Sequence, residues 1–532
     1  MEVDAAQYAA MSMEMSQTNS FLQVHHLGIN YLDKPPLIFW LGALSIKLFG
    51  INHFAYRLPN FLITLIGIFA TYALGKRLYN RNTGILSGIL IASSQIYILH
   101  NHDVRTDTLL TNFVVIAIWQ GYEYLQTKKL SNFIFAFVAV GFAMLAKGPI
   151  GAVVPVMALG THLLYKRDWA NIFNWRWIIG IGIVLVILAP MLWGLYQQFD
   201  LHPEASVNGR TGVSGLRFFF WEQSFGRITG ENVWKDDSSY FFFTHNYLWE
   251  FLPWSLLGIV AMFTKFKNLF GSKFSFTSSN EMLTMGGFIF PFLALSTSHY
   301  KLPHYIMVIM PMAAIFTAGY IDSIISSENA KARNVLSIIQ WVFSILIGFL
   351  VLFILYFIFP AQHAVWWMVP LTLFVLGFML FRKTDRVIRL IGPSLVAVVL
   401  TNIVMNGYFY PQLNQYQSGR KLADWAVENH IGSDQLVLVN KHYFNIYFYS
   451  GQNYHWSYPG KIKKTIQSQD LYVFTNDLGL KQFKENDITY KIEKRLYNFP
   501  NSELTFEFLN PDTRKNALEN FYILKVDQTK PL

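Results

Sequence analysis

Long apolar stretches recur along most of this 532-residue chain and limit what it can fold into. A membrane-spanning helix needs about 20 apolar residues, with a range of roughly 17–25. Stretches near that length lie at residues 58–75, 84–99, 108–125, 131–146, 149–165, 177–197, 247–264, 282–297, 303–323, 335–359, 364–381 and 388–407. Only 14% of the residues are charged, against the ~25% usual in soluble domains. The sequence therefore predicts a mainly α, polytopic membrane protein with about twelve spans.

Basic residues are divided unevenly between alternate loops, which predicts the orientation of the chain. One set of loops carries seventeen Lys and Arg residues, and the other set carries seven. Cytoplasmic loops carry the excess of Lys and Arg in membrane proteins. The second set, the N-terminal stretch and the C-terminal tail are therefore expected outside. This division accounts for the net charge of +10 without a nucleic-acid partner. The chain has no cysteine, so disulfides and thiol chemistry are excluded.

Three regions are expected. Residues 1–57 would form an outer-face loop in which the short apolar run 36–49 makes an interfacial helix. Residues 58–408 would be the transmembrane domain, including the long outer loop 198–246. Residues 409–532 are more polar and predict a small soluble α/β domain, with a helix near Gly419–Asn429. Its expected strands are Gln435–Asn440, Tyr443–Ser450, Leu471–Thr475, Tyr490–Lys494 and Asn520–Val526.

Acids and cations of the outer segments are the candidates for chemistry. Asp103, Arg105 and Asp107 stand at the mouth of a predicted span, where they could bind a cation or position an acceptor. The alternative is an ordinary helix start, because acids in the first turn favour the helix dipole. Asp4 is an acid of the N-terminal stretch, where no helix is expected to hold it. By its spacing alone, Asp4 is an ordinary surface carboxylate.

The loop 198–246 contains an aromatic run with Glu222 and Arg227 that predicts an amphipathic helix at the membrane interface. An arginine there can grip a phosphate bidentately. The alternatives for Arg227 are a lipid-headgroup anchor or an ion pair with Glu222. Lys34 and Lys301 each precede a proline-bearing apolar run, and with Arg227 they would form a phosphate site. A single lysine in such a place usually snorkels to headgroups.

Two further segments of the outer face are expected to have a structural role and not a chemical one. Lys147 precedes Gly148 and Pro149, and this tight turn between two spans explains the residue without chemistry. The fourteen histidines show no metal-ligand spacing, and His304 and Tyr305 are expected to line the start of their span.

Several motifs occur in an order that resembles a known family. They are Asp4–Ala9, Tyr31–Leu37, Arg105–Leu110, Lys147–Pro149, Trp221-Glu222 with Arg227, Pro253-Trp254, and Lys301–Pro303 with Tyr305. The chain resembles the bacterial glycosyltransferases of the GT-C class that use polyprenyl-phosphate sugars. Their familiar member transfers aminoarabinose to lipid A, and the protein O-mannosyltransferases are related to them. The resemblance covers roughly residues 1–320.

The resemblance implies roles for particular residues. Asp4 and Asp107 would be catalytic, and Lys34, Arg227 and Lys301 would bind the donor phosphate. The implied substrate-binding residues are Tyr31, Arg105, Glu222 and Tyr305. Whether a divalent metal takes part is left open, since Gln223 stands where a histidine or asparagine is common in the family. The family has thirteen spans, so a further span is expected ahead of Asp4.

The activity implied is transfer of a sugar from an undecaprenyl-type phosphate carrier, with inversion, to lipid A, a glycan or a protein. The protein is then expected in the bacterial inner membrane, among membrane lipids, with its active site and C-terminal domain in the periplasm. The alternative is a transporter or flippase for a lipid-linked sugar. Transporters commonly carry polar residues at mid-membrane and internal repeats, whereas the polar motifs here gather on one face. A scaffold acting through the C-terminal domain leaves those motifs unexplained.

Overall fold

The computed structural model describes residues 3–223, 226, 239–271, 281–440, 443–457, 471–486, 488–500 and 504–526. The chain divides into two compact units. The core unit consists of Glu14–Phe343 and Leu380–Val398, and the C-terminal unit consists of Met1–Met13, Ser344–Met379 and Val399–Leu532. Four helices cross the boundary between the units, namely α1 (Val3–Thr18), α17 (Ala330–Phe353), α18 (Ala364–Phe381) and α19 (Arg386–Val404).

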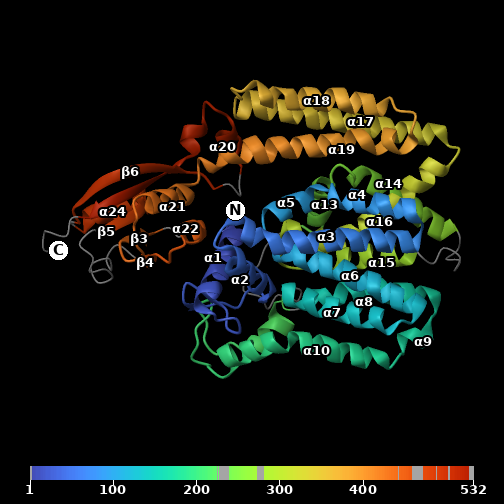
Figure 1. Cartoon of the computed structure of the whole chain (residues 1–532), viewed down its shortest axis with the longest axis horizontal. Coiled ribbons are helices and arrows are strands. Elements are labelled where there is room, and N and C mark those ends of the chain that lie inside the picture. The colour runs from blue at the N-terminus through green and yellow to red at the C-terminus, as the bar shows by residue number, and fades with distance from the viewer. Residues whose placement is uncertain are drawn as a thin grey trace. The chain divides into compact units, whose positions relative to one another are not determined.

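The core unit is built almost entirely of helices. Its elements are β1 (His25–His26), β2 (Ile29–Asn30), α2 (Leu37–Phe49), α3 (His53–Leu78), α4 (Arg81–Ala92), α5 (Gln95–His102), α6 (Thr106–Thr127), α7 (Leu130–Lys147), α8 (Ile150–Lys166), α9 (Trp169–Ile172), α10 (Arg176–Leu195), η1 (Tyr196–Asp200), α11 (Gly215–Arg217), η2 (Phe218–Glu222), α13 (Phe242–Glu250), α14 (Ser255–Gly271), α15 (Glu281–Ser296), η4 (Pro303–Ile309) and α16 (Met310–Ser326). In Figure 1, α3, α6, α7 and α10 lie one beside the next.

Each of the twelve predicted apolar stretches is mainly helical, although 84–99 is divided between α4 and α5 and 247–264 between α13 and α14. The predicted helix at residues 36–49 is α2. In the described ranges, seven helices are long and apolar enough to cross a membrane. The number rises to nine if each of two bent pairs is one span, α4 with α5 bent by 50° and α13 with α14 bent by 119°. The chain is therefore a multi-pass membrane protein, whose helices supply every backbone hydrogen bond within the apolar segment.

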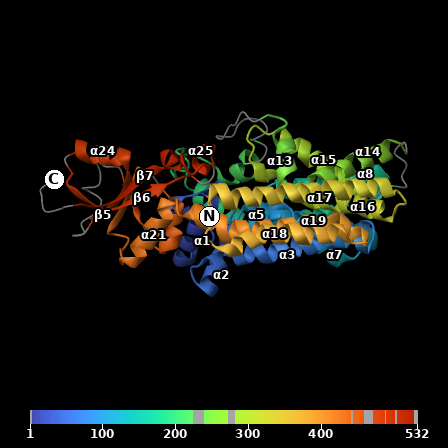
Figure 2. The same cartoon turned by 90° about the horizontal axis from the view of Figure 1, so that it is seen from above.

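Small residues let the helices of the core unit approach closely, as is usual where the hydrophobic effect does not drive helix association. Helices α8 and α15 pack against each other (Figures 1 and 2). A Cβ atom on Gly286 would lie 2.1 Å from the hydroxyl of Thr161, and one on Gly287 would lie 2.9 Å from the Cβ of Ala158. The two adjacent glycines of α15 thus set its distance from α8.

The N-terminal stretch differs from the predicted loop, because residues 3–18 form helix α1. The expectation that no helix holds Asp4 is therefore wrong, since Asp4 lies in the first turn of α1. Glu14, farther along the same helix, accepts hydrogen bonds from the backbone amides of Leu27 (2.6 Å) and Gly28 (2.8 Å). These two residues have positive φ and form the turn of the β1–β2 hairpin. Glu14 is therefore an anchor for that hairpin.

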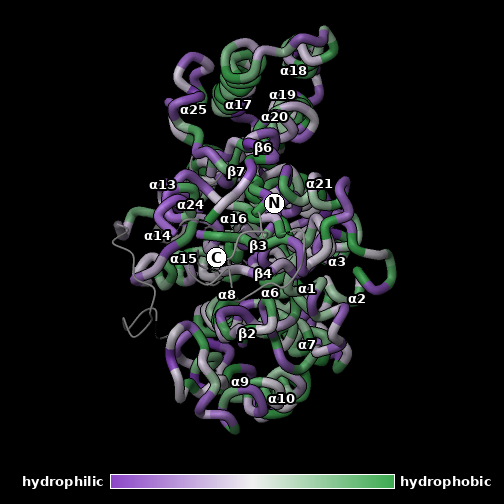
Figure 3. Tube along the Cα trace, turned by 90° about the vertical axis from the view of Figure 1, so that its left-hand side faces the viewer, coloured by the Kyte–Doolittle hydropathy of each residue, from purple (hydrophilic) through white to green (hydrophobic). Residues whose placement is uncertain are grey.

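The C-terminal unit combines membrane helices with a small α/β domain. Its further elements are η5 (Ile354–Ile358), α18 (Ala364–Phe381), η6 (Met405–Phe409), α20 (Tyr410–Asn414), α21 (Ser418–Glu428), β3 (Leu436–Val439), α22 (Phe444–Ser450), β4 (His455–Ser457), β5 (Leu471–Asn476), α24 (Asp477–Glu485), β6 (Tyr490–Asn498), α25 (Phe506–Leu509), η8 (Arg514–Ala517) and β7 (Glu519–Val526). The five strands form one mixed sheet in the order β4-β3-β5-β7-β6. In Figure 3 hydrophobic residues predominate along α17, whereas β6 is largely hydrophilic.

Four of the five predicted strands and the predicted helix of this domain are present. The predicted strand at Tyr443–Ser450 is wrong, because Phe444–Ser450 is helix α22. Its aromatic run resembles a strand in composition, but Ile446, Tyr447 and Phe448 are all buried, and the helix packs on α21. Gly451 ends the helix in the left-handed conformation (φ 70°) that favours glycine. The short strand β4 was not predicted.

Candidate active site

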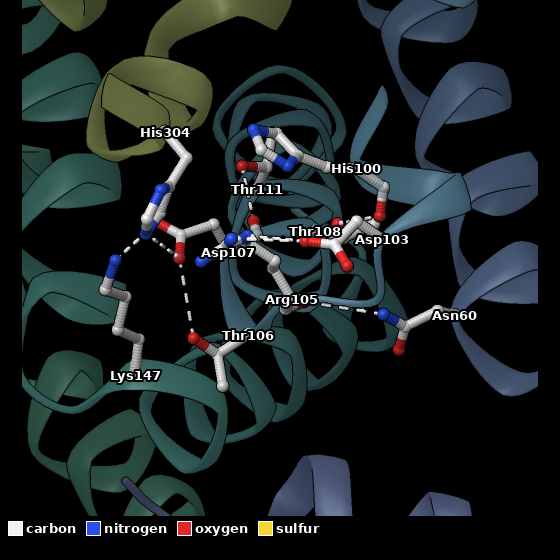
Figure 4. A network of polar contacts seen from close by, with 10 residues as sticks. All are labelled: Asn60, His100, Asp103, Arg105, Thr106, Asp107, Thr108, Thr111, Lys147 and His304. Atoms are coloured by element: carbon white, nitrogen blue, oxygen red, sulfur yellow. Dashed lines mark hydrogen bonds and ion pairs between the residues drawn. The ribbon is translucent and has the colours of Figure 1, made fainter. Parts of the chain in front are cut away.

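A buried carboxylate, Asp107, lies at the centre of a polar cluster in the core unit (Figure 4). Its Oδ1 atom forms an ion pair with the ammonium of Lys147. Its Oδ2 atom lies 3.7 Å from Nε2 of His304, which belongs to η4. The hydroxyl of Thr111 donates to the backbone carbonyl of Asp107 at 2.7 Å and holds this turn of α6 in place. Asp107 therefore sits between a cation from α7 and an imidazole from η4.

Local sequence explains how these groups meet. Asp107 occupies the first turn of α6, where a negative charge is favoured by the helix dipole. Lys147 is the last residue of α7, and Gly148 then turns the chain with φ 86°, a conformation open to glycine. Gly151 allows α8 to return against α7, since a Cβ there would lie 2.5 Å from the carbonyl carbon of Ala143. The turn that was interpreted as structural thus also delivers Lys147 to Asp107.

Arg105 and Asp103 form a second ion pair beside the first. Nε and Nη2 of Arg105 both lie 3.1 Å from Oδ2 of Asp103. The backbone carbonyl of Arg105 accepts a hydrogen bond from Asn60 at 3.4 Å (Figure 4). Each of the two predicted acids, Asp103 and Asp107, therefore has its own cationic partner. No group of three or more His, Asp and Glu side chains is placed to hold a metal ion in the described parts of the chain.

A cavity of about 190 Å³ adjoins this cluster, because Lys147 and Tyr305 line it. Its polar lining consists of Lys34, Lys147, Gln223, Ser298 and Tyr305. Its apolar lining consists of Leu110, Pro149, Ile150, Val153, Met157, Ala294, Leu295 and Val308. Segments far apart in the sequence therefore meet around one cavity. The wall is formed mainly by one face of α8 and the end of α15.

Tyr305 connects the cavity to the ion pair. The Lys147 ammonium lies 3.8 Å from the centroid of the Tyr305 ring, a distance typical of a cation–π contact. Tyr305 follows directly on His304, so one short element supplies both the imidazole near Asp107 and the ring beneath Lys147. The predicted substrate residue Tyr305 is thus placed in the cavity beside the cation.

A crevice of about 20 Å³ is also lined by Lys34, together with Tyr31 and Gln223. The Tyr31 ring packs edge-on against Phe39, with centroids 5.9 Å apart. The Gln223 amide donates to the backbone carbonyl of Asp33 at 2.5 Å. Gln223, at which the family pattern is broken, therefore joins the loop 198–223 to the segment that carries Lys34.

Other residues implied by the resemblance lie elsewhere or outside the described residues. Glu222 is near Arg210 (3.6 Å) and Arg217 (3.7 Å), not in the lining of the cavity. Lys301 is buried, with its ammonium 5.5 Å from the centroid of the Tyr240 ring. Arg227 lies outside the described residues. Asp4 belongs to the C-terminal unit, so its role stays a prediction from the sequence.

Two buried groups of the cluster were missed by the sequence analysis. Both carboxylate oxygens of Glu250 and both ring nitrogens of His100 are buried without a hydrogen-bond partner among the described residues. Glu250 ends α13 and is close enough to Asp107 for their charges to interact. The His100 ring lies 5.6 Å from that of His304. For Glu250 the available signal was its place inside the predicted span 247–264, because ionisable residues within spans are rare and usually functional.

The architecture defines the class of protein. The structure is similar to the crystal structure of ArnT from Cupriavidus metallidurans bound to undecaprenyl phosphate, with a TM-score of 0.73 and 16% identity. The match covers 98% of this chain and 93% of that one. The apo structure of the same protein matches with a TM-score of 0.70. The chain thus has the GT-C type of fold that the sequence motifs predicted.

Sequence comparisons point to particular relatives. Residues 33–193 match the family model for dolichyl-phosphate-mannose-protein mannosyltransferase. An uncharacterized protein of Aquifex aeolicus is 28% identical over 339 residues, 63% of this chain and 61% of that protein. The undecaprenyl phosphate-alpha-4-amino-4-deoxy-L-arabinose arabinosyl transferase of Edwardsiella ictaluri is 25% identical over 342 residues, 63% of this chain. The chain matches 58% of the length of that transferase. The predicted resemblance to glycosyltransferases with lipid-linked donors is confirmed.

Proposed function

We propose that this protein is a membrane glycosyltransferase whose donor is a sugar carried on a polyprenyl phosphate such as undecaprenyl phosphate. The cavity carries the proposal, because two lysines and a long apolar wall line the same space. An anionic headgroup on a hydrocarbon chain is the ligand that matches both features. Lys34 and Lys147 would bind the phosphate, and the face of α8 with Ile150, Val153 and Met157 would receive the first isoprene units.

The reaction needs little covalent participation from the protein. An acceptor oxygen attacks the anomeric carbon from the side opposite the phosphate, so the new bond forms with inversion. The bond between the anomeric carbon and the phosphate oxygen breaks, and its electron pair stays on the phosphate. Lys34 and Lys147 stabilise that developing charge, an effect that can supply several kcal/mol in a site shielded from water.

The acceptor decides where the proton goes. If the acceptor is a hydroxyl, its proton passes to a carboxylate, for which Asp107 is the candidate in the core unit. Asp4 is the carboxylate that the family resemblance assigns to this role. If the acceptor is a phosphate anion, no proton has to be removed, and the acids orient the acceptor instead. We place the reaction at the periplasmic face of the bacterial inner membrane, on the basis of the loop charges.

The first test is binding of undecaprenyl phosphate to the purified protein in lipid nanodiscs. Lys34→Ala should weaken binding about tenfold, since a charge-assisted hydrogen bond contributes ~1.5–3 kcal/mol. Lys47→Ala is the matched control, because Lys47 is an exposed lysine of α2 outside the cavity lining. Equal affinity of Lys34→Ala and the control would remove Lys34 from the phosphate site.

A second measurement separates the transferase from the transporter alternative. The protein is incubated with a radiolabelled polyprenyl-phosphate sugar and envelope extract, and the label is followed. A transferase moves the label onto an acceptor and leaves free polyprenyl phosphate, whereas a flippase leaves the donor chemically intact. Mass spectrometry of envelopes with and without the gene then identifies the sugar and the acceptor.

A further inference from the structure

Lys147 stands between two places where an anion can lie. Its ammonium is paired with Asp107, and the same side chain lines the cavity that we assign to the donor phosphate. The ring of Tyr305 lies beneath the ammonium at 3.8 Å and also lines the cavity. A small rotation of the lysine side chain over this ring would move its charge from the carboxylate toward the cavity.

The charged groups around Asp107 leave Lys147 as its main counter-charge. Arg105 is bound to Asp103 by two contacts of 3.1 Å, so it is already engaged by an acid of its own. His304 approaches Asp107 only to 3.7 Å. A buried carboxylate needs a counter-charge, and one buried cation cannot fully satisfy two anions. The ion pair between Lys147 and Asp107 is therefore in competition with any anion that enters the cavity.

We propose that Lys147 is a charge switch for which Asp107 and the donor phosphate compete. The inference rests on the proposed function, because it takes the ligand of the cavity to be a polyprenyl phosphate. Binding of the phosphate draws the ammonium away from Asp107, and the carboxylate is then free to engage an acceptor. Without donor, Asp107 stays paired. The competition thus links the availability of the acid to the presence of a sugar to transfer.

Linkage makes the proposal measurable without turnover. If the phosphate must displace Asp107 from Lys147, then removing the Asp107 charge must strengthen phosphate binding, because the coupling between two sites is reciprocal. Asp107→Asn should therefore bind undecaprenyl phosphate at least about fivefold more tightly than the wild-type protein, the lower end of typical coupling between sites. The same variant should lose sugar transfer to hydroxyl acceptors. A gain in binding together with a loss in transfer is not expected of a variant that is merely damaged.

The experiment measures the affinity for undecaprenyl phosphate in nanodiscs for a double-mutant cycle of Asp107→Asn and Lys147→Met. Lys147→Met alone should weaken binding, and Asp107→Asn should bring no gain in that background. Asp103→Asn is the matched control, because it removes a buried acid whose partner, Arg105, is outside the cavity lining. Asp103→Asn should change the affinity less than about twofold. Thermal unfolding of each variant confirms that it is folded, and Lys147→Gln, which also removes the charge, replaces Lys147→Met if the latter is not.

Each other outcome overturns a defined part of the proposal. Unchanged affinity of Asp107→Asn excludes the competition while leaving the proposed function intact. An equal gain with Asp103→Asn assigns the effect to the general field of the site and also excludes the switch. A gain that persists with Lys147→Met shows that another cation is shared. A wild-type protein that does not bind undecaprenyl phosphate refutes the proposed function, and the switch with it.

Discussion

Glu250 is a buried carboxyl group that is expected to lower the stability of the folded protein, because no partner among the described residues compensates for its loss of hydration. The carboxylate is fully buried, and the described part of the chain offers it neither a cation nor a hydrogen-bond donor. Glu14 is the contrasting case, since two backbone amides of the hairpin turn donate to its two oxygens. Both are buried glutamates of the core unit, and they differ in what surrounds them.

This contrast gives the first prediction. Glu250→Met should raise the apparent unfolding temperature, because a buried carboxyl without a hydrogen-bond partner carries a desolvation penalty of ~1–3 kcal/mol that an apolar side chain of similar size does not. Glu14→Met should lower it, because two backbone donors lose their acceptor. Sugar transfer should fall with Glu250→Met, as expected where a polar group is kept for function at the expense of stability. A less stable Glu250→Met protein would mean that the carboxyl has a partner of its own.

The residues of the site were predictable to different degrees. Asp107, Lys34 and Tyr305 were named through the family resemblance, whose motifs lie at the edges of apolar stretches. The pairing of Asp107 with Lys147 was not predictable, because nothing in the local sequence relates the start of α6 to the end of α7. Glu250 lies inside an aromatic run that reads as part of a span. The residues that bury it come from other helices, which a linear pattern cannot show.

The helices and strands can be predicted from the sequence where a single physical requirement decides the structure. An apolar stretch in a membrane must be helical, because its backbone has no other way to satisfy its hydrogen bonds. All twelve predicted stretches are mainly helical for that reason. Helix α1 was missed because its polar residues indicated a loop, although it is rich in Ala, Met, Glu and Gln, which favour helix. Helix α22 was missed because tertiary packing overrides an aromatic strand pattern.

The contact between α7 and α8 gives a prediction at this scale. Gly151→Ala would place its Cβ 2.5 Å from the Ala143 carbonyl carbon and 2.6 Å from the Met144 amide nitrogen. Backbone atoms cannot yield, so the two helices must separate and Lys147 must move. We expect a loss of both apparent stability and undecaprenyl phosphate binding, measured by thermal unfolding and by the nanodisc assay.

The matched control lies on the same helix. Gly160 is also in α8, and a Cβ there would meet no atom within 4 Å. Gly160→Ala should therefore be neutral or slightly stabilising, since glycine costs ~1 kcal/mol relative to alanine within a helix. Equal behaviour of the two variants would show that helix propensity, and not the close packing of α7 on α8, decides the result.

On the scale of the whole molecule, Arg514 connects two parts of the C-terminal unit. Its Nε donates to the carbonyl of Phe508 at 2.9 Å, and Nη2 donates to the carbonyl of Ile358 at 2.5 Å. The guanidinium also lies 4.4 Å from the centroid of the Phe359 ring. Because Ile358 and Phe359 follow the long apolar helix α17, one arginine joins the α/β domain to the end of a membrane helix.

Arg514→Lys should weaken this connection, because lysine cannot reproduce the planar fork or stack on the aromatic ring. The expected result is faster limited proteolysis of the polar domain, with cleavage between the membrane helices and the sheet. Arg495→Lys on the exposed edge strand β6 is the control, since Arg495 donates a hydrogen bond of 2.7 Å to Asn520 at the protein surface. Similar cleavage rates for the two variants would exclude a connecting role for Arg514.

The composition of the cavity has a consequence for how the protein is made. Lys34, Lys147 and Tyr305 line one space, although more than half of the 532-residue chain must be translated before Tyr305 emerges from the ribosome. Until η4 is inserted, the earlier helices carry Asp107 and Lys147 into the bilayer without the element that closes over them. We expect their ion pair to form already in that interval, because it would neutralise both charges and so protect the nascent chain. Chains that terminate before η4 should therefore be degraded more quickly by membrane proteases when they carry Lys147→Met than when they keep the lysine.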